Sequence, residues 1–172
     1  MKYHRINKDL FINNRKRYTE QIESNALAIF NSNDIYPISA DSTMPFQQHR
    51  DIFHLSGVDQ EESVLVLFPD CKNEAHREIL FLRETNEHIA VWEGEKLTKD
   101  AAFDVSGIKT VYWLSQMDNI LNTLLAEADK INMPDFSFSF SMAFFCLPFS
   151  SPLDANIFFP SLLNEIISFN AC

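Results

Sequence analysis

Residues 46–57 read FQQHRDIFHLSG, and a short acidic link joins them to residues 61–68, which read EESVLVLF. The first stretch predicts a polar turn, then an aromatic strand, then a corner at Gly57. The second predicts a strand that is buried on both faces, because its apolar residues run almost without interruption. The chain has only 3 glycines, so Gly57 is the clearest candidate for a residue with positive φ.

Helical and strand patterns alternate on both sides of this stretch. Upstream, residues 8–23 predict an amphipathic helix and residues 25–30 predict a strand buried on both faces. We expect the basic run Arg15, Lys16 and Arg17 to lie on the solvated face of that helix. Downstream, the patterns predict, in order, antiparallel strands at 63–68 and 78–82, a strand at 88–92, a helix capped by Thr98 and stopped by Gly107, a strand at 110–114, and a last helix capped by Ser115. This order indicates an α/β fold class, with a mixed sheet flanked by helices on both faces.

Length, charge and cysteine content restrict the class of protein. A chain of 172 residues is long enough to bury about 70% of the surface that it exposes when unfolded. The net charge of −10 argues against nucleic acid as a partner, because such binders present a basic face. Cys71, Cys146 and Cys172 show no CxxC spacing, which fits a reducing cytosol and neither a disulfide framework nor a thiolate zinc site. No apolar segment follows the amino terminus as in a secretory signal, so we expect a cytoplasmic location.

The side chains that could carry chemistry are few. His49 and His54 are five positions apart on the predicted turn and strand, where opposite parity would turn them to opposite faces. We therefore expect packing or surface histidines and no metal ligands. Ser56 lacks a Gly-x-Ser-x-Gly elbow, and glycines are too sparse for a phosphate-binding loop. Cys71 lies in a polar loop beside Lys72, which predicts an inert surface thiol.

The composition changes abruptly after residue 132. Residues 136–172 contain no Lys or Arg and are rich in Phe. Residues 136–141, FSFSFS, alternate as in an edge strand, and the apolar extension that follows is shorter than the roughly 20 residues of a membrane span. We place a domain at residues 1–132 and a divergent Phe-rich tail at residues 133–172. A sharper hypothesis is a shifted or truncated reading frame near Met133, which resequencing of the locus would test.

Residues 46–57 resemble a motif of the N-terminal domain of Xaa-Pro aminopeptidase (aminopeptidase P), in the creatinase/prolidase group. Family members carry aromatic-Arg-Gln-x-x-Asp-aromatic-x-aromatic-Leu-Thr-Gly, followed by an aliphatic strand. The residues in register are Phe46, Gln48, Asp51, Phe53, Leu55 and Gly57. Gln47 stands where many members carry Arg, and His54 stands where an aromatic residue is usual. With further matches at residues 40–42, 78–83 and 89–94, the resemblance covers residues 7–131.

The resemblance implies a creatinase/prolidase N-terminal domain-like fold with a ribonuclease H-like motif, and it singles out two residues. Trp92 matches a Trp that, in relatives, crosses a subunit interface and helps wall the neighbouring active site near the substrate proline. An indole offers a proline ring a flat apolar surface. Asp41 matches an acidic residue that points towards the substrate end of a neighbouring site. The alternatives are that Trp92 caps the sheet and that Asp41 is a turn residue.

The function implied is that of a non-catalytic domain. Relatives release the N-terminal residue from peptides with proline second, using two divalent metals, commonly manganese, held by a separate catalytic domain. That domain is expected to be absent here, so we expect no catalytic residue, no bound cofactor and no activity of this chain alone. The implied partners are a second copy, in a dimer or tetramer that restricts substrate access, and the peptide substrate, with no nucleic acid and no membrane. The alternatives are a stand-alone peptide- or protein-binding module, as in the large subunit of the FACT histone chaperone, and the N-terminal domain of a prolidase or creatinase.

Overall fold

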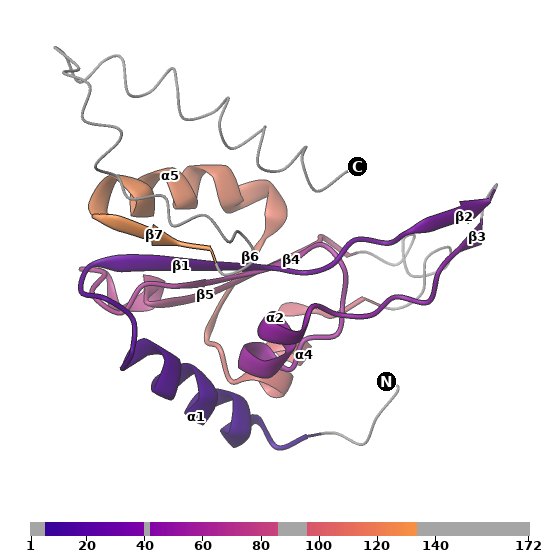
Figure 1. Cartoon of the computed structure of the whole chain (residues 1–172), viewed down its shortest axis with the longest axis horizontal. Coiled ribbons are helices and arrows are strands. Elements are labelled where there is room, and N and C mark those ends of the chain that lie inside the picture. Colours follow the sequence, from indigo (N-terminus) through magenta and orange to yellow (C-terminus); the bar gives the residue numbers. More distant parts are fainter. Residues whose placement is uncertain (1–5, 40–41, 86–95, 134–172) are drawn as a thin grey trace, which may run out of the picture. The chain divides into compact units, whose positions relative to one another are not determined.

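A five-stranded mixed sheet organises the residues that the computed structural model describes, which are 6–39, 42–85 and 96–133 (Figure 1). Its strand order is β6-β5-β4-β1-β7. The strands are β1 (Ala26–Asn31), β4 (Ser63–Leu67), β5 (Glu78–Leu82), β6 (Thr110–Trp113) and β7 (Lys130–Asn132). Strand β4 is antiparallel to both of its neighbours, whereas β6 pairs in parallel with β5 and β7 pairs in parallel with β1. The predicted mixed sheet is therefore confirmed.

Helices cover both faces of this sheet (Figure 1). Three of them, α1 (Lys8–Thr19), α2 (Arg50–Ser56) and α4 (Lys99–Ser106), lie on one face, and α5 (Met117–Glu127) lies on the other. The smaller elements are the paired strands β2 (Pro37–Ser39) and β3 (Ser42–Thr43) and the 3-10 turns η1 (Glu74–His76) and η2 (Leu114–Gln116). No helix among the described residues is long and apolar enough to cross a membrane.

The core lies mainly between the sheet and helices α2 and α4. Side chains alternate between the two faces of a strand, so every second residue of β1, β4 and β5 faces these helices. The buried cluster consists of Ala28, Phe30, Ile52, Leu55, Val58, Leu65, Leu67, Leu80, Leu82, Ala102 and Ile108. Each large aliphatic side chain in it stabilises the fold by about 1.5–3 kcal/mol.

The prediction of an aromatic strand within residues 46–57 is wrong, because Arg50–Ser56 form helix α2. The buried residues Ile52, Leu55 and Ser56 are spaced by three and four positions, which is the helical period. His49 caps the helix, since its Nδ1 accepts a hydrogen bond from the Asp51 amide. The aromatic residues in this stretch concealed the period. His49 and His54 consequently do not lie on opposite faces of a strand.

Gly57 and Gly107 end helices α2 and α4 in the same way. Both have left-handed φ values, 69° and 74°, as predicted for Gly57. In each case the preceding serine, Ser56 or Ser106, donates its hydroxyl to the carbonyl four residues earlier, at 2.7 Å. The same hydroxyl accepts the amide two residues later. The serine therefore supplies hydrogen-bond partners to backbone groups at the helix end, and the glycine allows the chain to turn there.

The expectation that Arg15 is solvated is also wrong, although Lys16 and Arg17 are exposed. Arg15 is only 1% exposed. Its Nη1 donates to the carbonyls of Leu55 at 2.8 Å and Ser106 at 3.0 Å, and its Nε donates to the Glu78 carboxylate at 2.9 Å. Burial lowers the pKa of Arg15, and the charge of Glu78 opposes that shift. Arg15 thus joins α1 to the C-terminal ends of α2 and α4, where helix dipoles favour a cation.

The helix starts and caps agree with the sequence in part. The helices predicted from residue 8 and after Thr98 are confirmed, and Thr98 accepts from the Ala101 amide at 3.2 Å. Ser115 is not the cap of the last helix, because it lies in η2 and α5 begins at Met117. Its hydroxyl hydrogen-bonds the Glu84 carboxylate instead. The strand predicted at 88–92 and the tail from residue 134 lie outside the described residues.

Cys71 is buried, which corrects the prediction of a surface thiol. Its loop folds back on the sheet, where the Cys71 amide donates to the Phe68 carbonyl and the Cys71 carbonyl accepts from Arg77. Burial raises the pKa of the Cys71 thiol, and nearby cations, including Lys72, offset that shift only in part. An inert thiol follows from burial, because the reactive thiolate is disfavoured.

Candidate interaction site

The sheet topology brings four strand ends together at one end of the sheet, namely the last residues of β1, β5 and β6 and the first residue of β4. Because β4 is antiparallel to β1 and β5, the chain leaves β1 where it enters β4 and where it leaves β5. The register shows this directly: Asn31 pairs with Val64, Ser63 pairs with Leu82, and Leu82 pairs with Trp113. We call this the hairpin end of the sheet.

Two connections begin at the hairpin end, and each carries one of the residues singled out by the sequence. Asp41 belongs to the connection between β1 and α2, and Trp92 belongs to the connection between β5 and α4. Both residues lie outside the described residues. The described flanks of both segments, however, start and finish at this same end.

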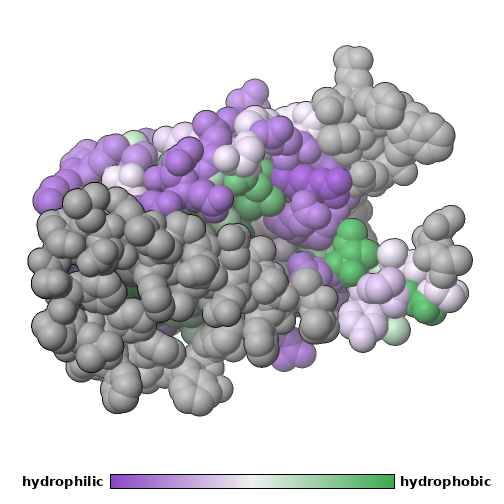
Figure 2. All heavy atoms as spheres, turned by 90° about the horizontal axis from the view of Figure 1, so that it is seen from above, coloured by the Kyte–Doolittle hydropathy of each residue, from purple (hydrophilic) through white to green (hydrophobic). Residues whose placement is uncertain are grey.

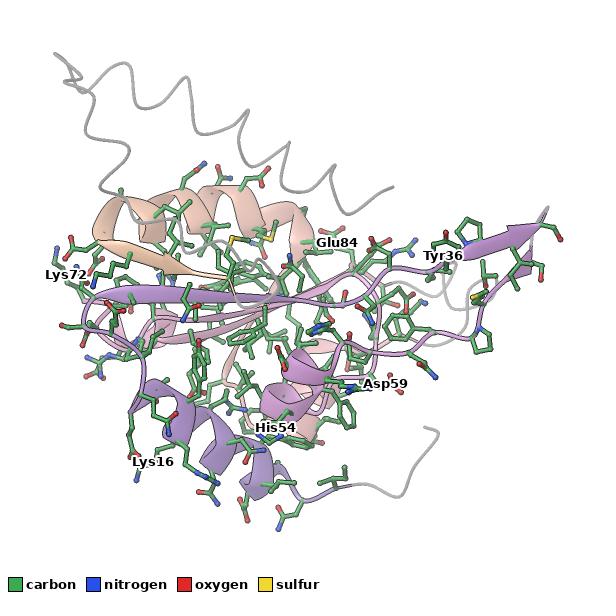
Figure 3. The ribbon with its side chains drawn as sticks, in the orientation of Figure 1. Lys16, Tyr36, His54, Asp59, Lys72 and Glu84 are labelled. Carbon is green, nitrogen blue, oxygen red and sulfur yellow. The ribbon has the colours of Figure 1, made fainter. Side chains whose placement is uncertain are left out.

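The connection after β1 forms a ribbon of β2 and β3 that extends away from the sheet (Figure 1). Its base is closed by a 2.8 Å hydrogen bond from the Met44 amide to the Tyr36 carbonyl. Tyr36, Ile38 and Met44 are 67%, 58% and 52% exposed, and Ile35 is also exposed. Figure 2 shows hydrophobic residues on this projection, and Figure 3 shows Tyr36 remote from the helical core. We call these four residues the hairpin surface.

An isolated two-stranded ribbon is only marginally stable in water. This one also exposes large apolar side chains together, which is typical of a surface that contacts another molecule. The hairpin surface therefore favours a binding function.

Gln48 ties the base of this projection to the core. Its Nε2 donates to the carbonyls of Val58 at 3.1 Å and Gln60 at 2.8 Å, and its Oε1 accepts from the His49 amide at 2.8 Å. One side chain thereby satisfies backbone groups from two loops. Gln48 is a residue of the family motif, and its role in the described structure is to fix loop geometry.

Residues 59–62, which we call the anchor loop, hold both flanks of the segment that carries Trp92. Glu61 forms an ion pair with Lys96, and their side chains are only 9% and 12% exposed. Gln60 Oε1 accepts from the Leu97 amide at 2.7 Å. On the other flank, Arg83 Nε lies 3.5 Å from the Glu62 carboxylate.

No group of three or more His, Cys, Asp or Glu side chains among the described residues could hold a metal ion. His54 is exposed on α2, whereas His49 caps that helix. The Ser56 hydroxyl is buried and is engaged by Ile52 and Val58. What this part of the chain presents is a projecting apolar surface on a firmly held base.

Comparison with known proteins identifies the family. The family described as "Aminopeptidase P, N-terminal domain" matches residues 11–132. The chain belongs to that family. The resemblance found in the sequence is thus confirmed.

Relatives of this aminopeptidase P N-terminal domain are whole peptidases. The chain is 28% identical over 126 residues to Xaa-Pro aminopeptidase of Escherichia coli (strain K12), covering 73% of this chain and 28% of the relative. It is 28% identical over 102 residues to Xaa-Pro aminopeptidase 3 of Homo sapiens, covering 58% of this chain and 20% of the relative. The chain therefore spans less than a third of the length of these relatives.

Solved structures confirm the fold. Pseudomonas aeruginosa aminopeptidase PepP superposes with a TM-score of 0.69 at 26% identity, over 75% of this chain and 29% of that one. Aminopeptidase P from E. coli with the inhibitor Pro-Leu gives a TM-score of 0.69 at 25% identity, over 81% of this chain and 32% of that one. The mixed sheet flanked by helices is the shared architecture.

Sequence reasoning missed the hairpin surface and the anchor loop. A signal for the first exists, since Ile35, Tyr36 and Ile38 cluster in a stretch without basic residues. No local signal exists for the second. Lys96 and Glu61 are 35 positions apart, so only the assembled sheet brings them together.

Proposed function

We propose that this domain serves self-association and restriction of substrate access in an Xaa-Pro aminopeptidase, an enzyme that releases the N-terminal residue from peptides with proline second. One observation carries the proposal. The hairpin surface and both described flanks of the Trp92 segment lie at a single end of the sheet, so one neighbouring molecule can contact this whole end. Such a contact would remove the exposed apolar side chains of the ribbon from water, which favours association.

In this proposal Trp92 and Asp41 act on the active site of a neighbouring subunit in a homo-oligomer, either a dimer or a tetramer. A rigid indole can pack against the proline ring of a peptide at low entropic cost. Asp41, in the connection between β2 and β3, would face the substrate end of the same site. The domain would then admit short peptides and exclude large ones.

The hydrolytic chemistry would come from two divalent metal ions, commonly manganese, bound outside this domain. Three of the described acids, Glu61, Glu62 and Glu78, are already paired with Lys96, Arg83 and Arg15. A cytoplasmic location, with no nucleic acid or membrane as partner, completes the proposal. The acidic net charge of −10 supports the exclusion of nucleic acid as a partner.

Light scattering coupled to size-exclusion chromatography tests the proposal. The chain should elute as a defined dimer or tetramer, and Ile38→Asp should shift it towards monomer, because a charge on the hairpin surface opposes burial. Leu10→Asp is the matched control, since Leu10 is also exposed but lies on α1. A parent chain that stays monomeric, or equal assembly of the two variants, would contradict the proposal.

A second candidate is a stand-alone peptide- or protein-binding module. The exposed hairpin surface on an acidic chain favours it. A monomer that captures basic peptides in the same experiment would support this reading. The N-terminal domain of a prolidase or creatinase is a third candidate, with the same fold and another substrate.

A further inference from the structure

The two flanks of the Trp92 segment are held by one short loop. Strand β5 ends at Leu82 and α4 begins at Lys99, and the described flanks between them are residues 83–85 and 96–98. Both contact the anchor loop, which immediately precedes β4. Two consecutive acids make these contacts. Glu61 pairs with Lys96 in the flank before α4, and Glu62 pairs with Arg83 in the flank after β5.

Hydrogen bonds from neighbouring side chains hold the anchor loop itself in place. The Gln60 carbonyl accepts hydrogen bonds from the Ser63 hydroxyl at 2.7 Å and from Gln48 Nε2 at 2.8 Å. Glu62 has a φ of 50°, in the left-handed region that non-glycine residues rarely occupy. Such a conformation persists only where its surroundings hold it. The loop is therefore a rigid base for its two carboxylates.

The Glu61–Lys96 pair is a poor device for stability alone. Both side chains are largely buried, so each charge loses most of its hydration on folding. Apolar side chains of similar volume are often as stabilising as a buried ion pair. A buried pair does, however, define one geometry, because neither partner can move without leaving a buried charge unpaired.

We propose that Gln60, Glu61 and Glu62 are positioning residues, which fix the points where the Trp92 segment leaves β5 and where it leads into α4. The Glu61–Lys96 pair and the Gln60–Leu97 bond hold the flank that leads into α4, and Glu62 with Arg83 holds the flank that leaves β5. This inference rests on the proposed role of Trp92. Its consequence is that the surroundings of Trp92 depend on residues that need not touch a substrate.

Trp92 can report on its own placement. The chain has 2 tryptophans, so Trp113→Phe leaves Trp92 as the only tryptophan, whose emission can be excited selectively over that of tyrosine. In that background, Lys96→Met and Glu61→Gln should each shift Trp92 emission and change its quenching by acrylamide. The double variant Glu61→Leu/Lys96→Met separates positioning from stability. It should regain the unfolding free energy of the parent and still show the altered Trp92 signal.

Lys72→Met is the matched control. Lys72 is an exposed lysine that faces Glu127 at 4.0 Å, at the opposite end of the sheet from Glu84 (Figure 3). It loses the same charge and should leave Trp92 emission and quenching unchanged.

Two results would overturn the inference. One is an unchanged Trp92 signal in both single variants. The other is a double variant that regains parental stability and also the parental Trp92 signal, which would make the pair an ordinary packing element. Light scattering on the same samples reports the assembly separately, so failure of the self-association proposal can be told apart from failure of this one.

Discussion

At the scale of single residues, the Arg15 guanidinium contacts acceptors from three elements. The two helix-end carbonyls and the Glu78 carboxylate use its planar set of donors, which a lysine ammonium could not match in geometry. A buried cation of this kind is tolerated because it is hydrogen-bonded to these three acceptors, one of which is a carboxylate. Residues 40, 63 and 91 positions away supply these acceptors. The local sequence, a basic run on a helix, therefore predicted solvent exposure.

Replacement of Arg15 by Met should destabilise the fold by about 3–5 kcal/mol, because Glu78 and two helix-end carbonyls lose their partner. Arg15→Lys should recover only part of that loss. Urea unfolding of both variants measures the effect. Arg17→Met, at an exposed position on the same helix, should stay within about 0.5 kcal/mol of the parent. Equal stability of the Arg15 and Arg17 variants would refute this role.

At the scale of elements, α1 packs directly on the two Ser-Gly helix ends. A Cβ atom at Gly57 would lie 2.3 Å from the Phe11 ring, and one at Gly107 would lie 2.7 Å from the Ile12 side chain. Neighbouring residues of α1 thus contact the two glycines. Glycine is required at each end by its φ and by this close approach. The sequence predicted the φ at Gly57 but not the helix lying against it.

Gly57→Ala should therefore cost more stability than Gly107→Ala. Both force an L-residue into the left-handed region, at about 1–2 kcal/mol, but the Phe11 ring is stiffer than the end of the Ile12 side chain. Thermal unfolding followed by circular dichroism orders the two variants. Adding Phe11→Leu to Gly57→Ala should recover part of the loss, as a double-mutant cycle would show. A smaller loss for Gly57→Ala than for Gly107→Ala would contradict this packing argument.

At the scale of the whole molecule, what could be predicted depended on how local its cause is. The apolar runs of β1, β4 and β5, the Thr98 cap and the Gly107 stop follow from neighbouring residues, and they were predicted. Helix α2 was missed, because a short apolar run fits both periods. The anchor loop was missed because its contacts exist only once β4 and β5 are paired. The family motif pointed to the right region through Gln48, whose contacts were invisible in the sequence.

At this scale, the distribution of charged side chains favours binding over catalysis in the described part of the chain. The hairpin surface consists of uncharged side chains, while three of the described acids, Glu61, Glu62 and Glu78, are already in ion pairs. The purified 172-residue chain, dialysed with manganese, should therefore retain no stoichiometric metal by elemental analysis and should not hydrolyse a short Xaa-Pro peptide. The E. coli Xaa-Pro aminopeptidase serves as the positive control. Turnover that follows the chain through successive columns, and is lost with a chelator, would mean that it carries metal ligands of its own, and the assignment of catalysis to another domain would fall.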